Sequence, residues 1–223
     1  MKDLGNQQYQ YQLNDTNMIL SGNNKRHGII SLKRPEFQEE IIKTETTFLL
    51  NLYRLNSKGK FRGLARREPF TVSQAGETGI TLNFPPTEVS PLNMQASYTV
   101  QSESTVDLTV SLQSEQDLED YEVFISSYFN GSLEPTMIIP NWPQKTADED
   151  MLFYKVEEQP LLKGYYLYFP RDDRAVHTFY DGRWIDPNKG EPIIDMIAGP
   201  MYGKPIAILA NEHLSIIQMA EVD

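Results

Sequence analysis

The chain has 223 residues, of which 39% are apolar, and it contains no cysteine. Its 31 acidic and 20 basic residues give a net charge of −11, which repels phosphate backbones and anionic membrane surfaces. We therefore expect a soluble chain with neither nucleic acid nor membrane as partner, and we exclude disulfides and cysteine-based zinc sites. The compartment, cytoplasmic or exported, and the oligomeric state stay open.

Segments with strand patterns follow one another through the first hundred residues. Met1 to Gln12 is polar and has no apolar core of a signal peptide, and no later run approaches the roughly 20 residues of a membrane helix. Pro35 to Ile42 is predicted as a short helix or a strand. Lys58-Gly59 predicts a turn and Pro85-Pro86 a break. The expected strands are Gly28–Lys33, Thr46–Leu55, Glu77–Phe84 and Ala96–Val100.

The clearest strand pattern runs from Val106 to Leu112. Apolar side chains alternate there with Asp107, Thr109 and Ser111, and this period of two indicates a half-buried strand. Tyr121 to Phe129 also alternates, but bulky groups occupy both faces, so we expect both faces to be covered.

The second half continues the pattern of short strands and turns. A single helical turn is expected at Arg171–Val176, and the chain ends directly after an apolar strand, which suggests a fragment of a longer protein. The expected strands are Leu152–Val156, Gly164–Phe169, Val176–Tyr180, Ile206–Ala210 and Leu214–Ala220. Many short strands with little helix predict an all-β fold, a large antiparallel β-sandwich that forms a single domain over residues 1–223.

The three histidines are the first candidates for acid–base chemistry. His27 lies in a polar turn before a strand, His177 within an apolar strand and His213 in a turn. None has the spacing of a zinc site, and each can equally be an ordinary structural histidine. His27 and His177 are the better catalytic candidates.

Sequence motifs of common enzymes are absent. There is no GxSxG, GxGxxG or GxxxxGK[ST], so neither a serine hydrolase nor a phosphate-binding loop is indicated. The acidic runs Asp148–Asp150 and Asp172-Asp173 read as solvated turns. We predict no cofactor and no metal site.

Aromatic side chains beside polar ones indicate sugar binding, because sugars stack their C–H faces on flat rings while polar groups bond their hydroxyls. Such residues occur in three loops, although the rings can equally cap the sandwich core. The predicted ligand-binding residues in these loops are Trp142, Tyr180, Arg183, Trp184 and Tyr202.

A cluster of arginines precedes Glu68-Pro69. If this segment is a strand, Arg62 and Arg66 share one face and Arg67 takes the other. Arg66 is then a candidate to bind a carboxylate, as in a uronic acid, through bidentate hydrogen bonds. Plain surface charge is the alternative.

Two stretches, Arg26–Leu32 and Tyr98–Phe129, resemble the galactose-mutarotase-like superfamily. The resemblance implies a β-supersandwich fold and a carbohydrate partner, and similar domains occur in bacteria and as modules of carbohydrate-active enzymes. True mutarotases use a His as general acid and a C-terminal Glu as general base. His177 lies in the matching half of the chain, but neither it nor Glu212 or Glu221 stands in the family's motif.

Three functions follow as hypotheses. The first is a carbohydrate-recognising domain of mutarotase-like fold, with or without catalysis. The second is a sugar-acting enzyme, an epimerase or a lyase or hydrolase fragment, in which a His lies within about 3–4 Å of a carboxylate or Tyr. The third is a structural or interaction module, which an exposed apolar strip over Ile216–Met219 would favour.

Overall fold

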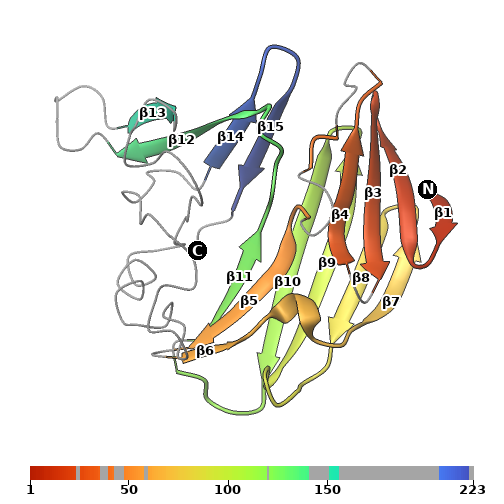
Figure 1. Cartoon of the computed structure of the whole chain (residues 1–223). Helices are drawn as coiled ribbons and strands as arrows, with labels where there is room; N and C mark the ends of the chain where they lie inside the picture. Colours follow the sequence, from red (N-terminus) through yellow and green to blue (C-terminus); the bar gives the residue numbers. More distant parts are fainter. Residues whose placement is uncertain are drawn as a thin grey trace. The chain divides into compact units, whose positions relative to one another are not determined.

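The computed structural model describes residues 1–23, 26–35, 40–42, 48–57, 60–119, 121–140, 151–155 and 206–220. Within these ranges the chain forms antiparallel strands and one short 3₁₀ helix, η1 (Ala65–Arg67) (Figure 1). This architecture confirms the predicted all-β, sandwich-like class. The strands are β1 (Lys2–Gly5), β2 (Gln8–Leu13), β3 (Thr16–Asn23), β4 (Arg26–Lys33), β5 (Asn51–Ser57), β6 (Lys60–Gly63), β7 (Thr71–Gly76), β8 (Gly79–Phe84), β9 (Leu92–Ser102), β10 (Thr105–Ser114), β11 (Glu122–Ser126), β12 (Glu134–Pro140), β13 (Met151–Lys155), β14 (Ile206–Ala210) and β15 (Ser215–Met219).

The chain divides into two compact units, and each is described by itself. The N-terminal unit contains Met1–Ser57 and Arg62–Asn130, and the C-terminal unit contains Lys58–Phe61 and Gly131–Asp223. The expectation that all residues form a single domain stays a prediction.

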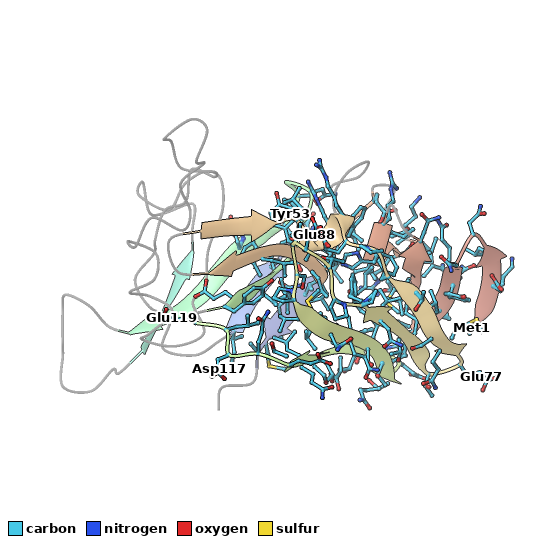
Figure 2. All side chains as sticks on the ribbon, turned by 90° about the horizontal axis from the view of Figure 1, so that it is seen from below. Met1, Tyr53, Glu77, Glu88, Asp117 and Glu119 are labelled. Carbon is cyan, nitrogen blue, oxygen red and sulfur yellow. The ribbon has the colours of Figure 1, made fainter. Side chains whose placement is uncertain are left out.

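The core of the N-terminal unit lies between two four-stranded sheets, with strand orders β1-β2-β3-β4 and β10-β9-β8-β7. The sheets face one another, because a Cβ added to Gly22 of β3 would collide with Val72 of β7. Figure 2 shows the side chains of these strands on the ribbon. Each fully buried large apolar side chain stabilises the fold by about 1.5–3 kcal/mol. The buried set includes Tyr11, Met18 and Leu20 from the first sheet and Ile80, Leu82, Phe84, Met94, Ala96 and Tyr98 from the second.

The second sheet is a regular ladder. Val110 of β10 pairs with Ala96 of β9, which pairs with Leu82 of β8, so one row across the sheet is apolar. The next row pairs Thr109 with Ser97 and is polar. Because side chains alternate between the faces, this register gives the sheet an apolar inner face and a polar outer face.

The third sheet has the order β11-β5-β6, and the segment that leads into β5 is irregular. Leu49 exchanges backbone hydrogen bonds with Ile29 at 2.9 and 3.1 Å, next to Gly28 of β4. Gly28 has φ +104°, and Leu50 has φ 52° although it is not a glycine. The Leu50 carbonyl accepts a 2.7 Å hydrogen bond from the Tyr98 hydroxyl. We call this place, where Gly28 meets Leu49 and Leu50, the Gly28–Leu50 crossing.

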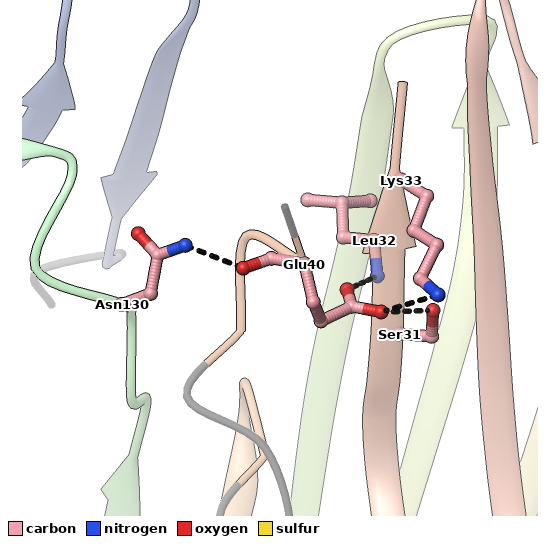
Figure 3. Close-up of polar contacts among 5 residues, drawn as sticks. All are labelled: Ser31, Leu32, Lys33, Glu40 and Asn130. Carbon is pink, nitrogen blue, oxygen red and sulfur yellow. Dashed lines mark hydrogen bonds and ion pairs between the residues drawn. The ribbon is translucent and has the colours of Figure 1, made fainter. Parts of the chain in front are cut away.

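Glu40 fixes a short segment beside β4 (Figure 3). Its carboxylate accepts hydrogen bonds from the Leu32 N–H at 2.7 Å and the Ser31 hydroxyl at 2.8 Å, and Lys33 Nζ lies 3.5 Å away. The Asn130 side-chain amide donates to the Glu40 carbonyl. Glu40 therefore links β4 to the segment that follows β11.

The C-terminal unit contains one four-stranded antiparallel sheet in its described part, with the order β13-β12-β14-β15. Ile208 of β14 pairs with Ile217 of β15 and, on its other side, with Thr136 of β12. On β15 the side chains of Ile217 and Met219 are 56% and 73% exposed.

The predicted strands that lie in the described ranges are present, with differences at several places. The sequence pattern does not predict the strands β1, β2, β3, β6, β7 and β12. The expected strand Thr46–Leu55 begins only at Asn51, because the crossing interrupts it. Gly164–Phe169, Val176–Tyr180 and Arg171–Val176 lie outside the described residues.

The structure also differs from the prediction at Glu40–Ile42 and at the arginine-rich segment. Glu40–Ile42 is not helical, and only Ile42 makes a β-bridge, with Phe129. Arg66 and Arg67 lie in η1 while Arg62 lies in β6, so the shared strand face expected for Arg62 and Arg66 is wrong.

Candidate functional site

The structure describes only some of the predicted site residues. His27 and Arg66 lie in its described ranges, and so does His213, an exposed histidine 3.0 Å from Glu212. The remaining predicted residues lie outside the described residues and stay predictions. They are Trp142, His177, Tyr180, Arg183, Trp184 and Tyr202.

His27 is a core residue of the N-terminal unit. It is the second residue of β4, and its side chain is fully buried. Two rings pack edgewise against its imidazole, those of Phe70 and Phe84, each with a centroid 5.4 Å away. The apolar surroundings follow from the strand pattern, which points His27 toward the inner face of the sandwich.

The protonation state of His27 follows from these surroundings. Its Nε2 accepts a 3.0 Å hydrogen bond from the Leu52 N–H, so the hydrogen of the neutral ring sits on Nδ1. Burial lowers the pKa of His27 to about 4, and the charge of Arg66 acts in the same direction. Nδ1 has no hydrogen-bond partner among the described residues. In this geometry the hydrogen bond between His27 and Leu52 holds β5 to β4, and no described carboxylate is hydrogen-bonded to His27.

Arg66 lies over an aromatic cluster in the same unit. Its guanidinium carbon is 4.6 Å from the centroid of the Tyr53 ring. The Tyr53 ring in turn contacts Phe124 at 5.9 Å and Tyr128 at 6.1 Å. We call these four residues the Arg66 cluster. Tyr53 comes from β5, Phe124 from β11 and Arg66 from η1, so three elements build it.

The Arg66 cluster combines apolar rings with a cation. Tyr53 is buried at 8% exposure, whereas Phe124, Tyr128 and Arg66 are half-buried and reach the surface. Among the described residues Arg66 has no ion pair and no hydrogen bond, and its planar group carries five N–H donors. Stacking on Tyr53 holds that group in place. The cluster can therefore offer fixed donors beside partly exposed rings.

The sequence indicates the members of the Arg66 cluster only singly. Arg66 was a candidate, and Tyr53, Phe124 and Tyr128 lie in segments that were expected to be strands. These residues meet because η1 lies against β5 and because β11 pairs with β5. The alternation of side chains along one strand does not predict either contact.

A second polar surface is the outer face of the β10-β9-β8-β7 sheet. Gln95 donates to Asn83 at 3.1 Å, and the hydroxyls of Thr81 and Ser97 lie 3.2 Å apart. Neutral hydroxyl and amide side chains make up most of the face, and Asp107 is its charged member. The rows from β10 to β7 are Ser111, Gln95, Asn83 and Thr71, then Thr109, Ser97, Thr81 and Gln74, then Asp107 and Thr99.

Metal binding and membrane insertion have no support in the described part. Its residues contain no group of three or more His, Cys, Asp or Glu side chains placed to hold a metal ion. No helix in these ranges is long and apolar enough to cross a membrane.

Comparison with known proteins gives no match, either to a protein-family model, to a curated protein or to a solved structure.

Proposed function

We propose that the chain is a carbohydrate-recognising domain that binds without catalysis, and that its fold is of the galactose-mutarotase-like type. The Arg66 cluster carries this proposal. The Arg66 guanidinium, which has no hydrogen bond or ion pair among the described residues, stacks on Tyr53, and the half-buried rings of Phe124 and Tyr128 contact Tyr53 in turn, so the cluster offers both kinds of contact that a sugar needs.

The cluster favours a sugar that bears a carboxylate, such as a uronic acid. A guanidinium binds a carboxylate through two parallel hydrogen bonds, and such charge-assisted bonds are the strong ones. The net charge of −11 opposes anionic ligands at long range. We therefore expect binding to short acidic oligosaccharides to strengthen as salt screens this repulsion, until screening of the Arg66 contact itself dominates.

The experiment is a glycan array with the whole chain and matched variants. Arg66→Ala and Tyr128→Ala should each reduce binding about ten-fold or more, and Arg66→Lys should lose nearly as much as Arg66→Ala because lysine lacks the planar fork. Arg67→Ala, an exposed neighbour in η1, is the control. Binding that survives all these changes, or no binding to any glycan, rejects the proposal.

A second candidate is an interaction module, and the exposure of β15 favours it. Ile217 and Met219 lie on one face of the strand and are more than half exposed. If this face binds a protein, excess wild-type chain should release a captured partner, whereas the Ile217→Ser/Met219→Ser variant should not. Equal release by both chains counts against this candidate.

A further inference from the structure

In the part of the chain that the structure describes, the edge strand β10 lacks the usual protection of sheet edges. It has ten residues and pairs with β9 on one side, and no strand of the described residues pairs with its other side. Unpaired N–H and C=O groups along an edge recruit further strands, so proteins normally protect edges with Pro, Lys or a bulge. The register with β9 shifts once, at the first residue of β10 between Thr105 and Val106, but from Val106 to Ser114 the ladder is unbroken, and β10 contains no Pro, Gly, Lys or Arg.

The opposite edge of the same sheet is protected. The strand β7 has only six residues, and its register with β8 shifts between Val72 and Gln74. A bulge of this kind twists the edge and interrupts its hydrogen-bonding row. The difference between β7 and β10 singles out β10 as the edge that is able to accept a partner.

The side-chain pattern of β10 matches a second copy of itself. In an antiparallel pair, residues opposite each other lie on the same face of the sheet. The apolar residues of β10 occupy every second position, so they meet apolar residues of the second copy only if the two-fold axis lies between the two copies of the same residue. An axis at Thr109 places Leu108 opposite Val110 of the second copy. It also places Val106 opposite Leu112, whose side chain is 49% exposed in one chain. Every apolar residue of β10 then has an apolar partner.

The charges also allow this pairing. With the axis at Thr109, Asp107 lies opposite Ser111 of the second copy, so the two Asp107 carboxylates do not face each other. Beyond the strand, Glu103 approaches Glu115 of the second copy, and these acidic residues repel weakly across solvent (Glu119 and Asp117, further along, are labelled in Figure 2).

We propose that β10 pairs antiparallel with β10 of a second copy of the chain, about a two-fold axis at Thr109, and joins the two β10-β9-β8-β7 sheets into one continuous sheet. This inference rests on strand pairing and is independent of sugar binding.

A cross-linking experiment tests the axis directly. The chain has no cysteine, so Thr109→Cys introduces a single thiol. Opposite Cβ atoms in antiparallel strands lie about 4.5–5.5 Å apart, close to the separation that a disulfide spans. With oxidised glutathione, full-length Thr109→Cys should form a covalent dimer at low concentration. The exposed Thr71→Cys on β7 should not. Equal cross-linking of both variants overturns the proposal.

Charge variants give a second, reversible readout. Thr109→Lys places two ammonium groups opposite each other and should weaken the dimer about ten-fold or more, measured by sedimentation of the whole chain. Ser111→Lys places each lysine opposite Asp107 and should strengthen it about three-fold or more. Thr71→Lys is the control. A wild-type chain that stays monomeric at all concentrations, or equal effects of Thr109→Lys and Ser111→Lys, overturns the proposal.

Discussion

The β10-β9-β8-β7 sheet and the Gly28–Leu50 crossing lie in the same unit but are stabilised in different ways. The sheet is a ladder of neighbouring strands, in which apolar rows alternate with polar rows. At the crossing, backbone with positive φ at Gly28 and Leu50 is held by bonds from residues far along the chain. Many similar contacts stabilise the sheet, whereas only a few specific hydrogen bonds and backbone conformations stabilise the crossing.

This difference predicts where single substitutions matter. A change on the outer face of the sheet removes one solvated side chain among many. A change at the crossing either collides with backbone or leaves a buried polar group without a partner, and both are costly.

Gly28→Ala should have the largest effect. An added Cβ would lie 2.7 Å from the Leu49 carbonyl oxygen, and φ is +104° there. Both problems involve backbone, so we expect a loss of about 3–5 kcal/mol in the free energy of unfolding, measured by urea denaturation. Gly76→Ala is the matched control, because a Cβ at Gly76 meets nothing within 4 Å. Similar losses for both variants would contradict the role of the crossing.

His27 should make stability depend on pH. Its pKa falls from 6.5 in the unfolded chain to about 4 in the fold. Between these values the unfolded chain binds a proton that the folded chain does not, so the free energy of unfolding falls as the pH drops from 6.5 to about 4. The expected loss is about 3 kcal/mol, and this contribution is fully present above pH 6.5.

The measurement compares urea denaturation of wild type and His27→Gln across that pH range. The variant should start less stable near neutral pH but lose less stability toward acid. His213→Gln, which changes an exposed histidine, should follow wild type. Parallel pH profiles for wild type and His27→Gln would show that His27 is not buried in its neutral form.

Tyr98→Phe should have an intermediate effect. The hydroxyl donates to the carbonyl of Leu50, and burial raises the pKa of Tyr98, so the group stays protonated and keeps donating. Its removal leaves a partly buried carbonyl without this donor, and we expect a loss of about 1–3 kcal/mol in thermal or urea unfolding. A neutral result would mean that Leu50 keeps its conformation without Tyr98.

Gln95→Ala should have the smallest effect. Gln95 is exposed on the outer face, and its side-chain amide donates to Asn83. We expect a change within about 0.5 kcal/mol in the same denaturation assay. A larger loss would mean that the outer face contributes to stability in the way that the crossing does, and the contrast between the two regions would fail.

The same contrast explains how much of the fold the sequence predicts. Val106–Leu112 alternates strictly, and the structure places it in β10, because solvent on one face and core on the other impose a period of two. The sequence does not predict β2, because its glutamines and tyrosines give no clear alternation of apolar and polar residues, although Tyr11 and Leu13 are buried. The sequence predicts a strand from Thr46, but β5 begins at Asn51 because Leu50 takes a left-handed conformation. This conformation is uncommon for a leucine, so the sequence gives no sign of it.

The candidate site was predictable only in part. The sequence shows Arg66 as a cation in an arginine-rich segment, but its stacking on Tyr53 is a tertiary contact that residue spacing does not reveal. The sequence around His27 predicts a polar turn, whereas the structure places His27 in the core. Its enclosure by Phe70 and Phe84 depends on segments more than forty positions away in the sequence.

The bonds around β5 also affect the order in which the chain folds during synthesis. The β1-β2-β3-β4 meander uses neighbouring strands and can form early. Asn51, at the start of β5, donates to Ser126, which is 75 residues later, and the Leu50 N–H donates to Ser127, 77 residues later. The strand β5 can pair with β6 as soon as both are synthesised, whereas its other edge has no partner until β11 is made. Until β11 emerges, that edge is open to chaperones and to other nascent chains.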